Sequence, residues 1–231
     1  MISKKVLLVV GAAAVFVLAL MPASTLADNL TISLQQGVGP VSTCADGAAC
    51  DTAFLGGVVA FNISGVDFNL GGIGAGTPAM PAGSMDLSYN LTDTFVSPGG
   101  VYTLLLTENN VTGPLTPLSF SALNNGNQTS NVTTAFTVYV DSSNALFGTG
   151  TILCSAPPAN SVVVDLSCGG AFTNGSNPYS LTEKIVLTTP PGFASASGDA
   201  LLTPVPEPGT LSMLGFGLLS FVGIFRRKLL A

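Results

Sequence analysis

The sequence contains no histidine and no tryptophan, and only 8% of its 231 residues are charged. Soluble domains average about 25% charged residues, so this chain is unusually poor in charge. Without histidine there is no Ser-His-Asp or Cys-His catalytic arrangement and no imidazole to bind a metal. Without tryptophan the best aromatic for stacking on a sugar face is missing. We therefore expect no catalytic residue, no metal site and no cofactor.

Basic residues are also scarce, and their positions are uneven. Five of the six lie near the ends of the chain, and only Lys184 lies between residues 28 and 208. That interval holds all twelve acidic residues, so twelve acids against one base give it a net charge of −11. Such a body repels phosphate backbones, which excludes nucleic acid as an expected partner.

The first 27 residues have the layout of a secretory signal peptide. Lys4 and Lys5 form a positive start, and the uncharged apolar run 6–20 follows. Small residues up to Ala27 occupy the positions that a signal peptidase reads. We expect cleavage after Ala27; the alternative is a retained membrane anchor.

The other end of the chain has an apolar run at residues 210–225, followed by Arg226, Arg227 and Lys228. Its 16 residues are slightly fewer than the roughly 17–25 that span a bilayer comfortably, and the cations can extend it by snorkelling. A buried core helix is the alternative, but the run has no amphipathic face. We predict a transmembrane helix. Basic flanks stay cytoplasmic, so the tail 226–231 lies inside and the body is exported.

The motif Val205-Pro206-Glu207-Pro208 precedes this helix and the three cations. The two prolines fix an extended, rigid backbone around the glutamate just outside the bilayer. In this order, the three parts closely resemble the PEP-CTERM sorting signal, over about residues 204–231. The resemblance implies a substrate of an exosortase, a membrane enzyme that would recognise Pro206, Glu207 and Pro208. It also implies a Gram-negative host that makes extracellular polysaccharide, and a body released to the cell surface or beyond.

The body, residues 28–188, is rich in short β-type segments separated by turn residues, with no long helical period. Threonine, valine and aromatic enrichment favours strands, and Asn-Gly pairs mark turns. We predict an all-β, antiparallel two-sheet sandwich of the jelly-roll or immunoglobulin-like kind, in one domain. The expected strands are Leu30–Gln35, Ala53–Ile63, Met85–Leu91, Val101–Thr107, Leu118–Leu123, Val132–Val140, Leu146–Leu153, Ser161–Ser167 and Tyr179–Leu187.

Two segments read as irregular chain. Residues 71–78, GGIGAGTP, are predicted to form a flexible loop; no Lys-Ser/Thr follows, so it is not a phosphate cradle. Residues 189–209, rich in proline, glycine and serine, are predicted to form a stalk that holds the body off the membrane.

The four cysteines are expected to form disulfides, because export places them in an oxidising compartment. Four cysteines allow three connectivities, and we favour the local one, Cys44–Cys50 and Cys154–Cys168. A metal site is the alternative, but the chain has neither a Cys-x-x-Cys motif nor a histidine.

Seven Asn-x-Ser/Thr triplets occur in the chain. They begin at Asn29, Asn62, Asn90, Asn110, Asn127, Asn131 and Asn174. In a secreted eukaryotic protein they would indicate glycosylation. In a bacterial protein we interpret them as a consequence of an asparagine- and threonine-rich β composition, with modification as the alternative.

Three functions from different classes fit the sequence. The favoured one is a non-enzymatic protein of the cell surface or extracellular polymer layer, associated with exopolysaccharide or biofilm. The second is a ligand-binding module for polysaccharide or calcium on the same anchor; Asp46 with Asp51, and Asp141 with Asn144, could offer oxygens to Ca²⁺, although solvated turns explain them too. The third is a hydrolase that uses paired carboxylates, which no motif marks.

Overall fold

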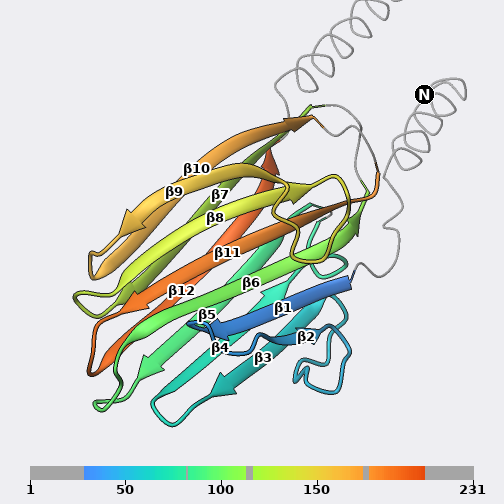
Figure 1. The fold of residues 1–231 in the computed structure, drawn as a ribbon. Coiled ribbons are helices and arrows are strands. Elements are labelled where there is room, and N and C mark those ends of the chain that lie inside the picture. Colours follow the sequence, from blue (N-terminus) through green and yellow to red (C-terminus); the bar gives the residue numbers. More distant parts are fainter. Residues whose placement is uncertain (1–28, 82, 113–116, 174–176, 206–231) are drawn as a thin grey trace, which may run out of the picture.

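The computed structural model describes residues 29–81, 83–112, 117–173 and 177–205, and these residues form two stacked antiparallel sheets (Figure 1). Sheet A has the strand order β2-β1-β6-β11-β8-β9, and sheet B has the order β10-β7-β12-β5-β4-β3. The strands of sheet A are β1 Asn29–Gln36, β2 Ser42–Ala45, β6 Gly100–Val111, β8 Thr133–Asp141, β9 Thr151–Ala159 and β11 Tyr179–Thr189. Those of sheet B are β3 Val58–Ser64, β4 Phe68–Ala75, β5 Met85–Asp93, β7 Pro117–Gln128, β10 Val163–Thr173 and β12 Ala194–Val205.

One hydrophobic core fills the space between the sheets. Strand β8 shows why: its residues alternate between half-buried and buried along the whole strand, and Phe136, Val138 and Val140 face inward. Successive side chains on a strand point to opposite faces, so this alternation places one apolar face on the core. The expected all-β, antiparallel two-sheet sandwich is confirmed, and each of the nine expected strands overlaps an observed one.

Strand β4 corrects the expectation of a flexible loop at residues 71–78, because Phe68–Ala75 pairs with both β3 and β5. The strand is not evident from composition, because glycine is rare in strands. The packing nevertheless requires glycine here. A Cβ at Gly72 would lie 2.5 Å from Ile32 Cδ1, and one at Gly74 would overlap Leu106 Cδ1. The side chains of sheet A therefore fill the space that larger residues on β4 would occupy.

Strand β12 corrects the expectation of a stalk at residues 189–209. Ala194–Val205 pairs with β5 on one side and with β7 on the other, so the segment lies in the middle of sheet B. Its small residues Ala194, Ala196 and Ala200 are buried together with Leu202. The composition resembles that of a linker because alanine occupies three of these four buried positions, and a Cβ at Gly198 would overlap the Tyr89 hydroxyl. Residues 206–209 lie outside the described part of the chain.

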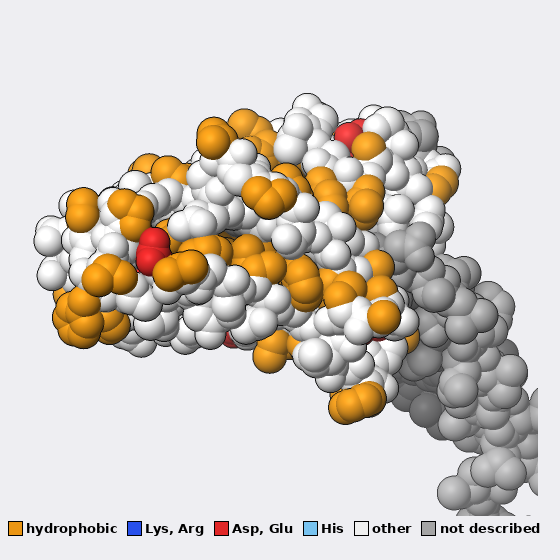
Figure 2. Space-filling model, turned by 60° about the horizontal axis from the view of Figure 1, so that its bottom comes forward, with side chains coloured by type: hydrophobic (Ala, Val, Ile, Leu, Met, Phe, Trp, Pro, Cys, Tyr) orange, Lys and Arg blue, Asp and Glu red, His pale blue; other side chains and the backbone are white. Residues whose placement is uncertain are grey.

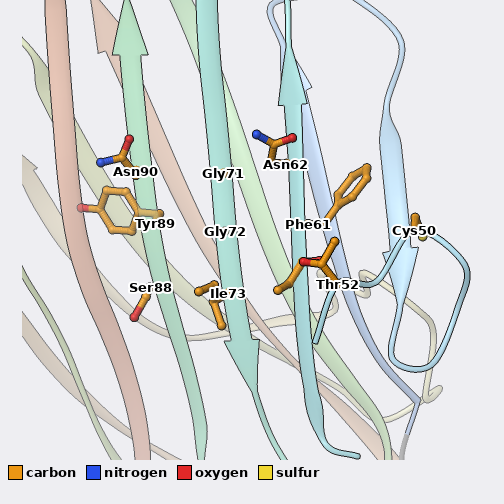
Figure 3. A pocket seen from close by; sticks show the side chains of 11 residues that line it. Cys50, Thr52, Phe61, Asn62, Gly71, Gly72, Ile73, Ser88, Tyr89 and Asn90 are labelled. Atoms are coloured by element: carbon orange, nitrogen blue, oxygen red, sulfur yellow. The ribbon is translucent and has the colours of Figure 1, made fainter. Parts of the chain in front are cut away.

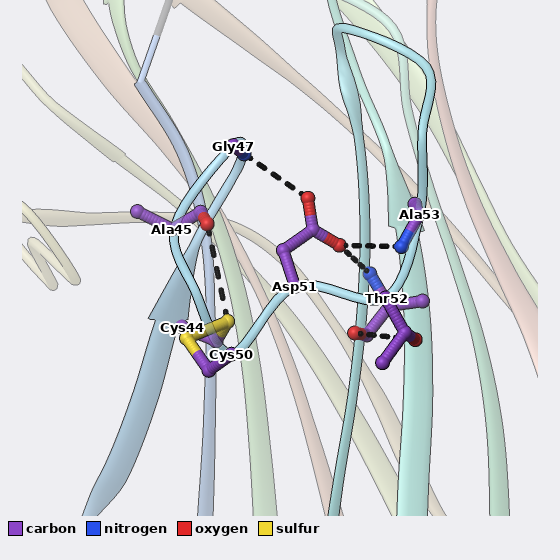
Figure 4. Close-up of a disulfide and its surroundings, with 8 residues drawn as sticks. Cys44, Ala45, Gly47, Cys50, Asp51, Thr52 and Ala53 are labelled. Carbon is purple, nitrogen blue, oxygen red and sulfur yellow. Dashed lines mark hydrogen bonds between the residues drawn. A yellow bond between two sulfur atoms is a disulfide. The ribbon is translucent and has the colours of Figure 1, made fainter.

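Both disulfides form with the expected connectivity. Cys44–Cys50 closes a short loop after β2, with a Cα–Cα distance of 5.8 Å (Figure 4). Cys154–Cys168 joins β9 of sheet A to β10 of sheet B, with a Cα–Cα distance of 5.7 Å. The second bond therefore ties the two sheets together at the edge where β9 and β10 lie.

Within the described residues, no helix is long and apolar enough to cross a bilayer. The predicted signal peptide 1–27 and the predicted transmembrane helix 210–225 lie outside the described residues.

The position of β12 yields a prediction about truncation. A chain that ends at residue 188, the body boundary expected from composition, lacks a central strand and is expected not to fold. A chain that ends at residue 205 keeps every strand and is expected to unfold cooperatively. Circular dichroism during thermal unfolding distinguishes the two, and a cooperative transition in the shorter chain would contradict the assigned role of β12.

Candidate functional site

The sequence-predicted sorting residues lie next to the end of the described structure. Pro206, Glu207 and Pro208, the cations Arg226, Arg227 and Lys228, and the cleavage position Ala27 are all outside the described residues. The described chain starts at Asn29 in β1 and ends at Val205 in β12. Both points lie at the same end of the sandwich: in Figure 1, β1 starts at the right and β12 ends near the top. The sorting motif therefore follows the last sheet residue directly, with no linker between them.

A groove on the outer face of sheet B is the candidate binding site, with a volume of about 540 Å³. It crosses β3, β4 and β5. Its lining includes Asn62, Gly71, Ile73, Ser88 and Asn90, and Figure 3 shows Asn62 and Asn90 on either side of Gly71. Volumes of about 300–1,000 Å³ are typical of small-molecule sites.

The segment 50–52 forms one wall of this groove, next to edge strand β3. Cys50 and Thr52 line the groove, and the backbone N–H of Thr52 donates to the carbonyl of Ala60 at 3.0 Å. The Thr52 hydroxyl donates to the same carbonyl at 3.2 Å. The Cys44–Cys50 disulfide fixes the start of this wall.

The floor of the groove combines an apolar centre with polar rims. Ile73 is 54% exposed and lies in register with Ser88 of β5. Asn62 is exposed and donates from Nδ2 to Asn69 Oδ1 at 3.0 Å, which leaves its Oδ1 and one N–H available. The groove can therefore contact the apolar face of a ligand at its centre and hydrogen-bond to it at the edges.

Two carboxylates lie beside the groove on the same face. Asp86 of β5 and Asp199 of β12 are neighbours, and the Ser88 hydroxyl donates to Asp199 Oδ1. Burial, together with the charge and hydrogen bonding of Asp199, raises the pKa of Asp86 to about 6. On β11 of sheet A, burial, and then the charges of Asp86 and Asp199, raise the pKa of Glu183 well above its usual value.

Glu183 is fully buried among core residues, and neither of its carboxylate oxygens has a hydrogen-bond partner in the described chain. Among the described residues, no group of three or more cysteine and acidic side chains forms a metal cluster. Asp86 and Asp199 thus form a pair on the outer face of sheet B, while Glu183 lies in the core and is one of three fully buried acids among the described residues, with Asp93 and Glu108.

In the two loops considered for calcium, side-chain oxygens accept hydrogen bonds from the protein itself. Burial raises the pKa of Asp51, but hydrogen bonds from the backbone N–H groups of Ala60, Ala53 and Gly47 outweigh it and lower the pKa overall (Figure 4). Asp46 Oδ2 accepts from the Gly57 N–H at 2.6 Å.

In the second loop, Asp141 Oδ1 accepts from the Ser143 N–H at 2.8 Å and from the Ser143 hydroxyl at 2.7 Å. Asn144 Oδ1 accepts from the Asn110 N–H at 2.7 Å. Each of these four side chains thus already accepts at least one hydrogen bond through an oxygen that the sequence offered to Ca²⁺.

The body surface offers little positive charge. Within the described residues the one basic side chain is that of Lys184, on β11. The view in Figure 2 shows scattered acidic side chains, no basic ones, and hydrophobic side chains running along a furrow. A polyanion would find no cluster of cations on this body.

The comparisons with known proteins identify the C-terminal segment. Residues 204–228 match the family described as the PEP-CTERM protein-sorting motif, so this segment is a PEP-CTERM sorting motif. The match is confined to that segment and leaves the body without a family. A comparison with curated proteins gives no match.

Solved structures show distant similarity to the body. One, titled "CBM4 structure and function", is 14% identical over 51% of this chain and 84% of its own, with a TM-score of 0.28. TmCBM61 in complex with β-1,4-galactotriose is 10% identical over 60% of this chain and 88% of its own, with a TM-score of 0.29. The enzymatically active domain of bacteriophage CBA120 tailspike protein 4 is 12% identical over 77% of this chain and 19% of its own, with a TM-score of 0.32. Scores this low do not establish a shared fold.

Sequence reasoning missed the groove entirely. Its residues come from three strands and a loop, and the sequence predicts a flexible loop at its central residue, Gly71. In the sequence, two of its asparagines, Asn62 and Asn90, stand out only as the first residues of Asn-x-Ser/Thr triplets. The spacing of those triplets was the available signal, because an Asn and a Ser or Thr two residues apart lie on one face of a strand.

The raised pKa of Asp86 yields a prediction about pH. Its pKa of about 6 lies above the value near 3.9 of an unfolded chain, so between these values the folded protein binds more protons. Stability is therefore expected to fall as the pH rises from about 4 to about 6. Asp86→Asn should raise the melting temperature at pH 7.5. It should also reduce the difference between the melting temperatures measured at pH 4.5 and pH 7.5. Part of that difference should remain, because the pKa of Glu183 is also raised and this residue is unchanged in the variant.

Asp165→Asn is the matched control, because it removes one negative charge from β10 at the far edge of the same sheet. If both variants change the melting temperature at pH 7.5 equally, the repulsion within the Asp86–Asp199 pair is not responsible.

Proposed function

We propose that this chain is a non-enzymatic protein of the bacterial cell surface or extracellular matrix, associated with exopolysaccharide. In this proposal a signal peptidase removes residues 1–27, the C-terminal helix holds the exported body at the inner membrane, and an exosortase then processes the tail. The body passes from the periplasmic side of that membrane to the surface or the medium. The observation that carries the proposal is the sorting motif at residues 204–228.

The geometry of the body supports a short-lived anchor. The described chain begins and ends at the same end of the sandwich, so the sorting motif and the N-terminus of the processed body would face the membrane together. Because β12 ends at Val205 in the sheet, the motif would be held near a rigid body rather than on a long stalk. A fixed, extended motif loses less entropy when an enzyme cleft binds it.

A non-enzymatic body is supported by composition. The chain has no histidine to act as a base. In the described structure Asp86, whose pKa is raised, and its neighbour Asp199 lie on one sheet face beside the groove. A hydrolase that uses two carboxylates needs them on opposite sides of a bound substrate.

A ligand-binding module for polysaccharide is the second candidate, on the same anchor. The observation that favours it is the groove of about 540 Å³ across β3, β4 and β5, with its apolar floor and amide rims. Calcium as the ligand is less well supported, because Asp46, Asp51 and Asp141 already accept hydrogen bonds from the backbone N–H groups of Gly57, Ala60 and Ser143.

Sorting is tested in cells by replacing Glu207 and Pro208 with alanine. The double variant is expected to stay in the inner-membrane fraction at full length, while the parent appears as a shorter form at the surface or in the medium. Immunoblots of cell fractions measure both forms. The control Thr210→Ala, which leaves the Pro-Glu-Pro motif intact, should be processed like the parent. Equal release of the double variant and the parent would remove the sorting proposal.

A further inference from the structure

Three of the Asn-x-Ser/Thr triplets lie in strands of sheet B and point to one face. Asn62 lies on β3, Asn90 on β5 and Asn127 on β7, and all three side chains are exposed. The residue after each is directed toward the core, and the Ser or Thr after that faces outward again. The triplet is therefore the sequence pattern of a strand that presents an amide and a hydroxyl on the outer face of the sandwich.

The strand register aligns these three asparagines in one row across the sheet. Asn62 is paired with Gly71, and Gly71 with Asn90. Asn90 is paired with Ser197, and Ser197 with Asn127. Because neighbouring strands lie about 4.8 Å apart, the asparagines are spaced about 10 Å apart along the row. Small residues, Gly71 and Ser197, occupy the strands between them.

A second row of hydroxyls runs beside the first. Ser64, Thr92 and Thr129 complete the three triplets, and Ser195 of β12 is the residue opposite Thr92. The backbone N–H of Thr129 donates to the Ser195 carbonyl at 2.8 Å, which continues the row beyond the end of β7. The outer face thus carries amides in one line and hydroxyls in the next.

The amides in the row are available to a ligand. Within the described part of the chain, the side chains of Asn90 and Asn127 have no hydrogen-bond partner, and Asn62 uses one N–H on Asn69. An amide offers a donor pair and an acceptor, which suits adjacent hydroxyl groups that both donate and accept. The groove lies between Asn62 and Asn90, where Gly71 leaves the floor open.

We propose that the row Asn62–Gly71–Asn90–Ser197–Asn127 binds a neutral polysaccharide that runs across the strands of sheet B, with one sugar ring seated over Gly71 and Ile73. The inference rests on the second candidate function above and names its site and ligand class. Amides and hydroxyls recognise the sugar hydroxyls, and exposed Ile73 contacts the apolar face of the ring.

The negative charge of the outer face of sheet B favours a neutral polysaccharide over an anionic one. Asp86, Asp199 and Asp165 are its carboxylates, and it carries no lysine or arginine among the described residues. An anionic polysaccharide would be repelled without a cation to compensate it. The proposal also explains three of the seven Asn-x-Ser/Thr triplets. Asn62, Asn90 and Asn127 would form a binding row, and their side chains must remain unmodified to bind a sugar.

The test is isothermal titration calorimetry on the full-length protein in detergent. The probes are three neutral polysaccharides, dextran, galactomannan and mixed-linkage β-glucan, and one anionic polysaccharide, alginate. We expect at least one neutral polymer to bind and alginate not to bind. The double variant N62A/N90A should weaken the Kd at least about tenfold, because it removes hydrogen bonds on both sides of the groove.

The variant Gly71→Val distinguishes an effect on binding from an effect on folding. A Cβ at residue 71 would lie 3.6 Å from Asn62 Cβ and 4.0 Å from the Phe61 carbonyl oxygen, which are ordinary contacts. Valine also favours a strand more than glycine does, so the melting temperature should hold or rise. Its side chain would fill the groove floor, and we expect binding to weaken about tenfold or more. Asn160→Ala, in the turn after β9, is the matched control and should bind like the parent.

Four results would overturn the proposal. These are no binding to any of the three neutral polymers, tighter binding to alginate, unchanged binding by both N62A/N90A and Gly71→Val, or a mass spectrum showing glycans on Asn62 and Asn90. The sorting variant Glu207→Ala with Pro208→Ala should bind as the parent does. A failure of sorting and a failure of sugar binding are therefore seen in different variants.

Discussion

The pairing of β12 between β5 and β7 is the constraint on which the rest of the structure depends. This strand closes sheet B at its centre, and without it the sheet would divide into β3-β4-β5 and β7-β10. Its buried alanines and Leu202 complete the core under both neighbours. The same strand ends at Val205, so the last residues that hold the body together lead directly into the sorting motif. Any processing enzyme must therefore act beside a folded sheet.

The same pairing gives the outer face of sheet B its order. Residues on β5 and β7 come into one row only because β12 holds them at fixed register, with Ser197 between Asn90 and Asn127. A slip of one residue would turn every side chain of a strand to the other face, and would bury the amides while exposing the core. The hydrophobic core thus fixes the register, and the register arranges the polar face. Stability and the proposed binding surface have one structural origin.

Much of this fold could be predicted from the sequence, for a physical reason. Strand β8 places Phe136, Val138 and Val140 at alternate positions, which is the pattern of a strand with one buried face, and the local spacing of the cysteines favoured the observed disulfides. Strands β4 and β12 were missed because glycine and alanine carry little hydrophobic signal, and their places depend on side chains from other strands such as Ile32 and Leu106. Short β2 was missed as well.

The groove could not be predicted, because it depends on register between strands far apart in sequence. Asn62 of β3 and Asn127 of β7 are separated by three intervening strands along the chain, and only strand pairing places them in one row. The sorting motif, by contrast, is local, and its order of prolines, glutamate, apolar run and cations could be recognised without any structure. A motif made of consecutive residues could thus be predicted from the sequence, whereas a site made of residues from several strands could not.

The most direct test of this account is hydrogen exchange at the backbone amides of Ala194–Val205, measured by mass spectrometry on the full-length protein. A central strand exchanges mainly through global unfolding, whereas a stalk exchanges freely. The account predicts that these amides are protected as strongly as those of β11 in the core of sheet A. Exchange within seconds across this segment would contradict it, and would return the segment to the role of a stalk.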